Sequence, residues 1–218
     1  MTKFCNDADI IRYEPALFGE MSLPGQVLAE GTGASVSGTT LAAEGADFAG
    51  AQVSAGGVVY LRSADGALDG AYEIVSVGSA TELCVSAVRT DPQSDAIPLR
   101  DAENVSYRVG TLGPQIDEVS FRLTEHLGIK PGDAGSDIET EQILDKSFLK
   151  QATVFGVLSV VYAMSASKAE DENHWKKSMH YRRMFEKAKE RCRVQIDKDS
   201  DGLADLTRFG GCGGLVRE

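Results

Sequence analysis

Alternating aspartates near the end of the sequence have the residue type and spacing that best fit a defined chemistry. The pattern comprises Asp197, Asp199, Asp201 and Asp205 in the stretch "IDKDSDGLAD". An EF-type calcium loop takes oxygen ligands from positions 1, 3, 5, 7 and 9 and from a bidentate glutamate at position 12. Counted from Asp197, the four aspartates fill positions 1, 3, 5 and 9, and Arg208 replaces the glutamate. The loop therefore either holds Ca²⁺ weakly or is a turn whose Asp side chains bind their own backbone.

Residues that commonly carry out catalysis show no recognisable arrangement in the sequence. No GxSxG elbow is present, and no cysteine has a histidine nearby. His174 and His180 are six residues apart in a predicted helix, so they lie on different faces, and His126 falls at a predicted helix end. We interpret the three histidines as structural. The sequence predicts no catalytic residue, no enzyme and no cofactor apart from weakly bound Ca²⁺.

The charge of the chain argues against binding to nucleic-acid backbones. Its formal net charge is -11, whereas non-specific binding to phosphates needs a surplus of Lys and Arg. Basic residues nevertheless concentrate between Ser165 and Gln195, where nine Lys and Arg stand against five Asp and Glu. The acidity therefore comes mainly from elsewhere in the chain.

Cysteine usage and the first residues indicate the compartment. Cys5, Cys84, Cys192 and Cys212 are far apart and form no CxxC pair, which is typical of reduced thiols in a cytosolic protein. The opening "MTKFCNDADIIR" carries charges where a signal peptide needs an apolar core, so secretion by that route is not expected.

The chain divides into zones of different composition. Residues 1–22 predict one or two helical turns, a break at Pro15 and a further turn. Residues 23–112 are rich in Gly, Ser, Thr and Val, with short strand-like runs about ten residues apart and turn signals between them. This second zone predicts a small antiparallel β-sandwich or barrel.

Residues 113–196 predict a helical domain. One helix is expected from Pro114 to a stop at Gly128, a second from Asp145 through an apolar run, and a third from about Asp171. The apolar run, Ala152 to Met164, is shorter than the roughly 20 residues that a bilayer span requires. We therefore expect a buried helix and no membrane anchor.

Side-chain size indicates how these helices pack. A strip of small residues, Gly156, Ser159 and Ala163, would let another helix approach the second one closely. The buried seam of the third helix is expected to consist of Trp175, Ser178, Tyr181, Phe185, Ala188 and Cys192.

Residues 197–218 are expected to form the Asp-rich loop and a glycine-rich arm, which is either disordered or ordered by a partner. The predicted fold class is α+β. In it, N-terminal and C-terminal segments form a helical bundle, and the small antiparallel β domain is an insertion between them.

The order of these parts resembles the head–tail connector (adaptor or neck) proteins of tailed bacteriophages. The resemblance is carried by "DADIIRYEPALF", "QIDEVSFRLTEHLGI", "LDKSFLKQATVFGVLSVVYA", "ENHWKKSMHYRRMFEKAKERCRV" and "DKDSDGLAD". It covers the N-terminal stretch and the chain from about Pro114 onward, whereas residues 23–112 depart from the minimal all-helical adaptor.

The resemblance implies a structural protein of the virion neck, assembled in the host cytoplasm. Such proteins form a homo-oligomeric ring, commonly of twelve subunits, between the portal and a neck or tail-completion protein. DNA passes through the lumen without specific recognition. The C-terminal arm would then dock on the portal, and the residues expected to do so are Arg208, Phe209, Leu215, Val216 and Arg217.

The Asp loop and the Gly-, Ser- and Thr-rich strands also fit a second hypothesis. In it, the chain is a calcium-dependent binding or adhesion module whose β domain recognises a surface ligand. A calcium titration separates the two hypotheses.

Overall fold

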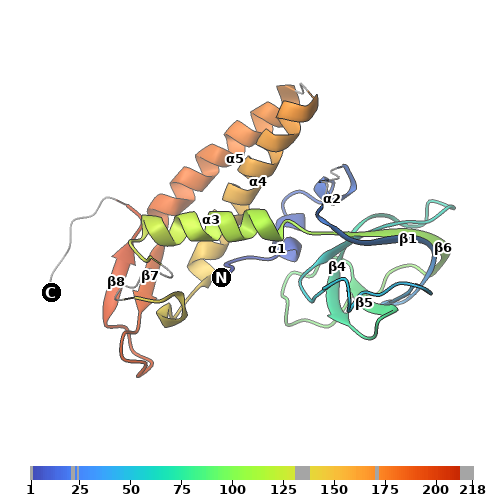
Figure 1. Cartoon of the computed structure of the whole chain (residues 1–218), viewed down its shortest axis with the longest axis horizontal. Helices are drawn as coiled ribbons and strands as arrows, with labels where there is room; N and C mark the ends of the chain where they lie inside the picture. Colours follow the sequence, from blue (N-terminus) through green and yellow to red (C-terminus); the bar gives the residue numbers. More distant parts are fainter. Residues whose placement is uncertain (1, 21–22, 24, 131–137, 170–171, 212–218) are drawn as a thin grey trace. The chain divides into compact units, whose positions relative to one another are not determined.

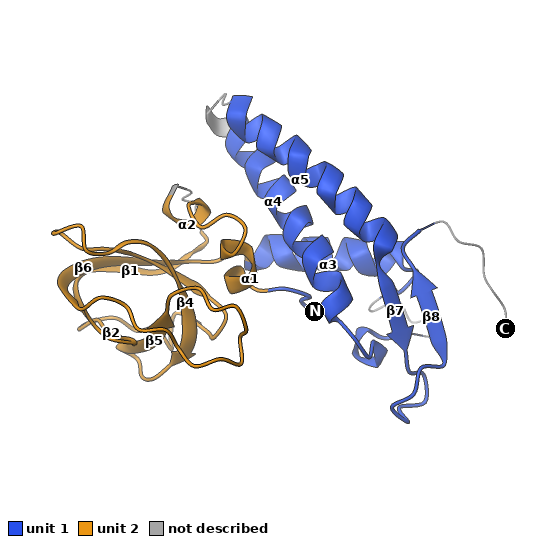
Figure 2. Cartoon of the chain, turned by 180° about the vertical axis from the view of Figure 1, so that it is seen from behind, with its two compact units in different colours: residues 1–5, 113–218 blue, residues 6–112 orange. Residues whose placement is uncertain are grey.

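The computed structural model describes residues 2–20, 23, 25–130, 138–169 and 172–211. The chain is mixed α and β, and its described residues include five α-helices and a closed antiparallel barrel. It forms two compact units, which Figure 2 distinguishes by colour. Unit 1 comprises residues 1–5 and 113–218, and unit 2 comprises residues 6–112.

Unit 2 is built around a six-stranded barrel, which confirms the expected small antiparallel β domain. The strands pair in the order β1-β2-β5-β4-β3-β6, and β6 pairs with β1 to close the barrel (Figure 1). Their bounds are β1 (Val27–Ser37), β2 (Thr40–Ala42), β3 (Val58–Arg62), β4 (Asp69–Val77), β5 (Glu82–Ser86) and β6 (Ala102–Gly110). Irregular register between β1 and β6 bends the long first strand, as closure of a small barrel requires.

Alternating β-branched and aliphatic side chains fill the barrel interior. Val59, Leu61 and Val85 are completely buried, as period-2 patterning predicts for strands with one face inward. Phe48, from the loop after β2, is also completely buried, and its ring meets that of Tyr107 edge-on at 5.6 Å. The barrel is therefore a packed core and not a channel.

A buried ion pair fastens the segment after β5 to the barrel wall. Arg89 donates through Nη2 and Nε to the two carboxylate oxygens of Glu73, at 2.8 and 3.2 Å. The same guanidinium donates through Nη1 to the Ser94 carbonyl at 2.6 Å. Bidentate geometry with a third bond satisfies a charge that would otherwise be costly to bury.

The two N-terminal helices belong to unit 2. Their bounds are α1 (Asp7–Ile11) and α2 (Leu17–Glu20). The Asp7 carboxylate accepts a hydrogen bond from the Leu112 amide at 2.9 Å, and Arg108 on β6 donates to the Gly19 carbonyl at 2.9 Å. Both hydrogen bonds are to residues of unit 2, and the expected bundle of N-terminal with C-terminal helices is not confirmed.

Unit 1 contains the three long helices and a β-hairpin. Its elements are α3 (Gly113–His126), the 3₁₀ turn η1 (Thr140–Gln142), α4 (Ser147–Ala169), α5 (Glu172–Arg191), β7 (Arg193–Ile196) and β8 (Leu206–Phe209). The helix ends agree with the sequence: Gly128 follows α3 with a φ of +69°, and Asp145 accepts the Ser147 amide at 2.9 Å.

Helices α4 and α5 form an antiparallel hairpin (Figure 1). Phe155 packs near Tyr181 and Tyr162 near His174, with ring centroids 6.2 and 5.6 Å apart. Gly156 allows close packing with α3 and α5, because an added Cβ would lie 2.6 Å from Val119 Cγ1. Close approach at the predicted small-residue strip is therefore confirmed at this glycine.

Two expectations for unit 1 are wrong. Trp175 was expected in the buried seam of α5, yet 54% of it is exposed, because it projects beside the seam that Ser178 and Tyr181 occupy. The chain after α5 was expected to be only a loop and an arm. It instead forms the β7–β8 hairpin, which Leu144 extends by donating its amide to the Gln195 carbonyl.

The length and composition of α4 would by themselves suffice to cross a membrane. Its window from Ser147 to Ser167 has a mean hydropathy of 1.3, but 56% of that window is buried inside the protein. Burial of this extent is usual for the core helix of a folded domain.

Candidate functional site

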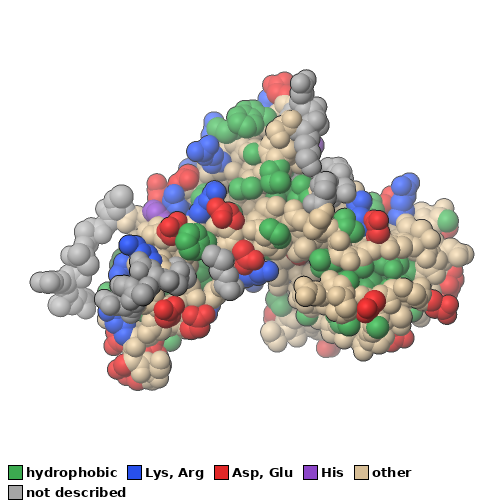
Figure 3. Space-filling model, viewed as in Figure 1, with side chains coloured by type: hydrophobic (Ala, Val, Ile, Leu, Met, Phe, Trp, Pro, Cys, Tyr) green, Lys and Arg blue, Asp and Glu red, His purple; other side chains and the backbone are tan. Residues whose placement is uncertain are grey.

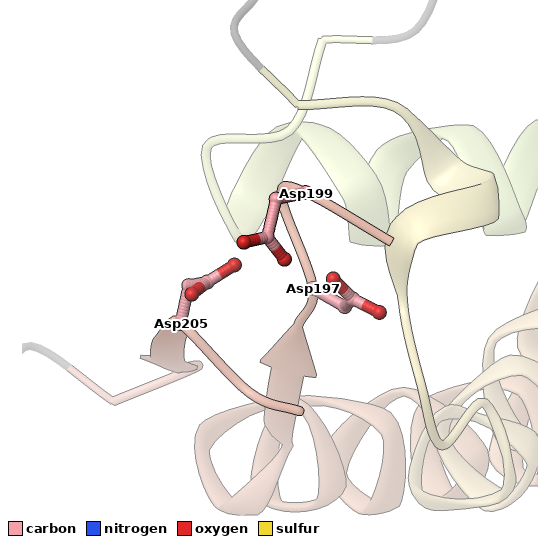
Figure 4. A group of neighbouring side chains, drawn as sticks. All are labelled: Asp197, Asp199 and Asp205. Carbon is pink, nitrogen blue, oxygen red and sulfur yellow. The ribbon is translucent and has the colours of Figure 1, made fainter. Parts of the chain in front are cut away.

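The Asp-rich stretch is the connection of the β7–β8 hairpin. Arg193 pairs with Phe209 and Ile196 with Leu206, so the residues from Asp197 to Asp205 lie between the two strands (Figure 4). The hairpin holds both ends of the loop at a fixed separation. Asp197 and Asp205, eight positions apart, can thereby converge.

The buried carboxylate of Asp197 stabilises the loop by accepting hydrogen bonds from its backbone. Asp197 is only 6% exposed, and its carboxylate accepts the amides of Ser200, Asp201 and Gly202 at 2.6, 3.2 and 2.8 Å. Burial raises the pKa of Asp197, but hydrogen bonds from these backbone amides outweigh burial and lower the pKa below its ordinary value. The left-handed conformations of Ser200 and Gly202 turn the amides inward.

Three of the four expected metal ligands come together. One carboxylate oxygen each from Asp197, Asp199 and Asp205 lie within 4.8 Å of one another, as Figure 4 illustrates. Asp201 is not part of this group, and its Oδ1 accepts the Leu203 amide at 2.7 Å. Asp205 also accepts the Lys198 amide at 2.7 Å.

The geometry therefore serves both interpretations of the loop. Carboxylate oxygens are the ligands that Ca²⁺ prefers, and Asp197, Asp199 and Asp205 occupy the first, third and ninth positions of the calcium pattern. At the same time, Asp197, Asp201 and Asp205 each accept hydrogen bonds from the loop's own backbone, as in Asx turns. Ca²⁺ would need further oxygens from backbone carbonyls and water.

The residue at the twelfth position contributes to packing within unit 1. Arg208, on β8, donates through Nη1 to the Leu127 carbonyl at 3.1 Å, and so caps the end of α3. His126 lies within 2.6 Å of the Gly210 carbonyl through Nε2. Phe209 is 58% exposed, whereas the other expected docking residues, Leu215, Val216 and Arg217, lie outside the described residues.

A groove between α4 and α5 is a site that the sequence did not predict. It has a volume of about 310 Å³. Its lining consists of Phe148, Gln151, Ala152, Phe155, Met184, Lys187, Ala188, Arg191 and Cys192. Phe148 is 59% exposed at one edge, and hydrophobic side chains are visible on the surface of the α4–α5 hairpin in Figure 3. Because α4 is apolar around most of its circumference, its sequence contained a signal for a second apolar face.

Cys192 lies in the wall of this groove without the properties of a nucleophile. It is 3% exposed, its thiol donates to the Ala188 carbonyl at 3.3 Å, and burial raises its pKa to about 11. A thiol with a raised pKa is largely protonated at neutral pH and reacts poorly.

Comparisons of the chain with models of protein families, with curated proteins and with solved structures found no match. The functional argument therefore depends on the residues and their geometry.

Proposed function

We propose that the chain is a structural subunit of a phage neck. It forms a ring, commonly of twelve copies in proteins it resembles, that joins the portal to a neck or tail-completion protein and lets DNA pass. In this proposal α3, α4 and α5 form the bundle from which the ring is built. The protein acts without catalysis and assembles in the host cytoplasm.

The observation that carries the proposal is the uncovered apolar surface of unit 1. Nine large hydrophobic residues are exposed among the described residues, and six of them belong to unit 1. These six are Leu144, Phe148, Met164, Trp175, Leu203 and Phe209. Phe148 borders the groove between α4 and α5, which other apolar side chains line, and an exposed apolar surface of this kind is typical of one that a partner covers.

The charge of the protein supports passage of DNA. An acidic surface repels phosphates, so a net charge of -11 suits a channel through which DNA must slide without adhering. Residues 6–112, which make up unit 2, contain fifteen Asp and Glu against five Lys and Arg, so unit 2 is the part of the chain that would repel DNA.

The portal is proposed to bind at the end of the β-hairpin and the chain beyond it. Phe209 is exposed on β8, where the Arg193 guanidinium lies 5.7 Å from the centre of its ring. Truncation after Gly211 retains β8 and removes Leu215, Val216 and Arg217, so it separates the arm from the hairpin. We expect this truncation, and Phe209→Ser, to weaken co-purification with the portal protein of the same phage.

Electron microscopy of the chain, alone and mixed with that portal, tests the ring directly. We expect rings in at least one of the two samples, and Phe148→Ser to reduce them. The matched control is Ile97→Ser, which changes an apolar residue of unit 2 that is 46% exposed. A particle that stays single with and without the portal contradicts the proposal.

Convergence of Asp197, Asp199 and Asp205 favours a second candidate, a calcium-dependent binding or adhesion module. Calorimetric titration with Ca²⁺ tests it, and Asp199→Asn is the variant. Within the described part of the chain the loop's backbone donates hydrogen bonds to Asp197, Asp201 and Asp205 and none to Asp199, so this substitution leaves those hydrogen bonds in place. Absence of both heat and thermal stabilisation eliminates this candidate.

A further inference from the structure

Basic side chains form a continuous stripe along α5. The positions are i, i+4, i+7, i+11 and i+15, which a 3.6-residue period places on one face over a length of about 22 Å. The stripe consists of Lys176, His180, Arg183, Lys187 and Arg191, all of which are exposed. Two acidic residues border this face: Glu172 pairs with Lys176 from the preceding turn at 2.8 Å, and Glu190 lies three residues after Lys187.

The cations toward the C-terminal end of the stripe lack acidic partners within the described part of the chain. No ion pair there joins Arg183, Lys187 or Arg191 to a carboxylate. Lys187 and Arg191 also line the groove beside Phe148, so the charged stripe borders an apolar surface. A partner that is acidic with an apolar margin fits this face.

Unit 2 has a sector of the opposite charge. Residues 13–61 and 63–88 contain no Lys or Arg, so the adjacent strands β2, β5 and β4 carry no cation. Glu44, Asp47 and Glu82 are exposed at one end of this sector. Hydrogen bonds bring them together: Ala42 pairs with Glu82, and the loop after β2 bonds through Phe48 to the Ala80 carbonyl at 2.8 Å. Acidic side chains also predominate on the face of unit 2 seen in Figure 3.

We propose that the basic stripe of one copy binds the acidic sector of a second copy. Every chain carries both surfaces, and stripe against stripe or sector against sector would place like charges together. A contact between unlike surfaces can repeat head-to-tail from copy to copy, and such repetition generates a ring or an open helical filament. This inference rests on the proposed ring and assigns the surfaces between its neighbouring subunits.

Charge reversal on each surface tests the contact with full-length chains. One variant is Arg183→Glu with Lys187→Glu, and the other is Glu44→Lys with Glu82→Lys. Sedimentation velocity of the wild type is expected to show association that increases with concentration and is lost as salt screens the charges. Each variant alone is expected to associate at least about tenfold more weakly, because like charges now face one another.

Mixing the two variants provides the decisive measurement. The reversed stripe of one variant is complementary to the reversed sector of the other, so an equimolar mixture should recover association. The control Arg182→Glu makes the same change as Arg183→Glu about 100° away around α5, and should leave association unchanged. Circular dichroism checks that each variant is folded.

Several results would overturn the inference. They are a wild type that remains monomeric at low salt, a mixture that does not recover association, or duplex DNA bound through Arg183 in place of a second copy. Rings that form regardless of both reversals would contradict these surfaces and leave the connector proposal intact. A chain that forms no assembly with or without the portal would contradict the connector proposal itself.

Discussion

Replacing Gly156 with alanine tests the close packing of α4 against its neighbours. A Cβ at this position would lie 2.6 Å from Val119 Cγ1 and 3.1 Å from the Phe185 ring. Val119 is 2% exposed, so it cannot move toward solvent to make room. The new methyl group must therefore displace packed side chains or shift a helix.

Two opposing contributions set the magnitude. Helix propensity alone favours alanine over glycine by about 1 kcal/mol within a helix. Overpacking a well-filled site costs about 1–3 kcal/mol, and a 2.6 Å approach to a buried group belongs in the upper part of that range. We expect Gly156→Ala to lower the free energy of unfolding by about 1–2 kcal/mol net, which corresponds to a decrease in Tm of about 2–8 °C.

Thermal unfolding followed by far-ultraviolet circular dichroism measures this change, because α3, α4 and α5 contribute most of the described helix. Val119→Ala is the companion variant, which removes the group that the new Cβ would strike. The double variant should lose about 1 kcal/mol less than the sum of the single variants. A higher Tm for Gly156→Ala, or strictly additive losses, would refute the packing argument.

Three further predictions concern the barrel, the loop and the groove. Glu73→Gln should destabilise unit 2 by about 3 kcal/mol in urea unfolding, because Arg89 keeps a buried charge without its ionic partner. A change below about 1 kcal/mol would show that solvent reaches the pair. Because the pKa of Asp197 is lowered, its stabilisation of the loop is complete above its unfolded-state pKa and is lost as the pH falls through its folded-state pKa. Amide-exchange protection at Gly202 should therefore decline over that acidic range, and an Asp197→Asn variant that kept the wild-type pH dependence would contradict this. Cys192, with a pKa of about 11, should resist alkylation at neutral pH until the protein unfolds, as peptide mass spectrometry would detect.

Local sequence signals were sufficient to predict most of the helices. Pro114 and Gly128 marked the ends of α3 because their backbone preferences act without help from distant residues. The sequence also predicted the close approach at Gly156, because only a residue without a side chain leaves room for Val119. In contrast, the exposure of Trp175 depended on which face α4 covers, and α5 by itself does not specify that.

The candidate sites depended on the folded geometry of the chain and not on residue spacing alone. The sequence marked four aspartates as equal candidates, but the backbone amide of Leu203 occupies an Asp201 oxygen while Asp205 is held beside Asp199. The groove next to Phe148 exists only because α5 returns along α4 and leaves part of its apolar surface uncovered.

The sequence by itself determined the helices, the existence of a small antiparallel β domain, and the aspartate spacing, because these features depend on residues near one another in the chain. Only the tertiary structure decided the closed strand order, the pairing of α1 and α2 with the barrel, and the β7–β8 hairpin. Strands β7 and β8 are four residues each, too short to show a period of their own. They are defined by hydrogen bonds across the Asp-rich loop, and such pairing between separated segments is not encoded in local composition.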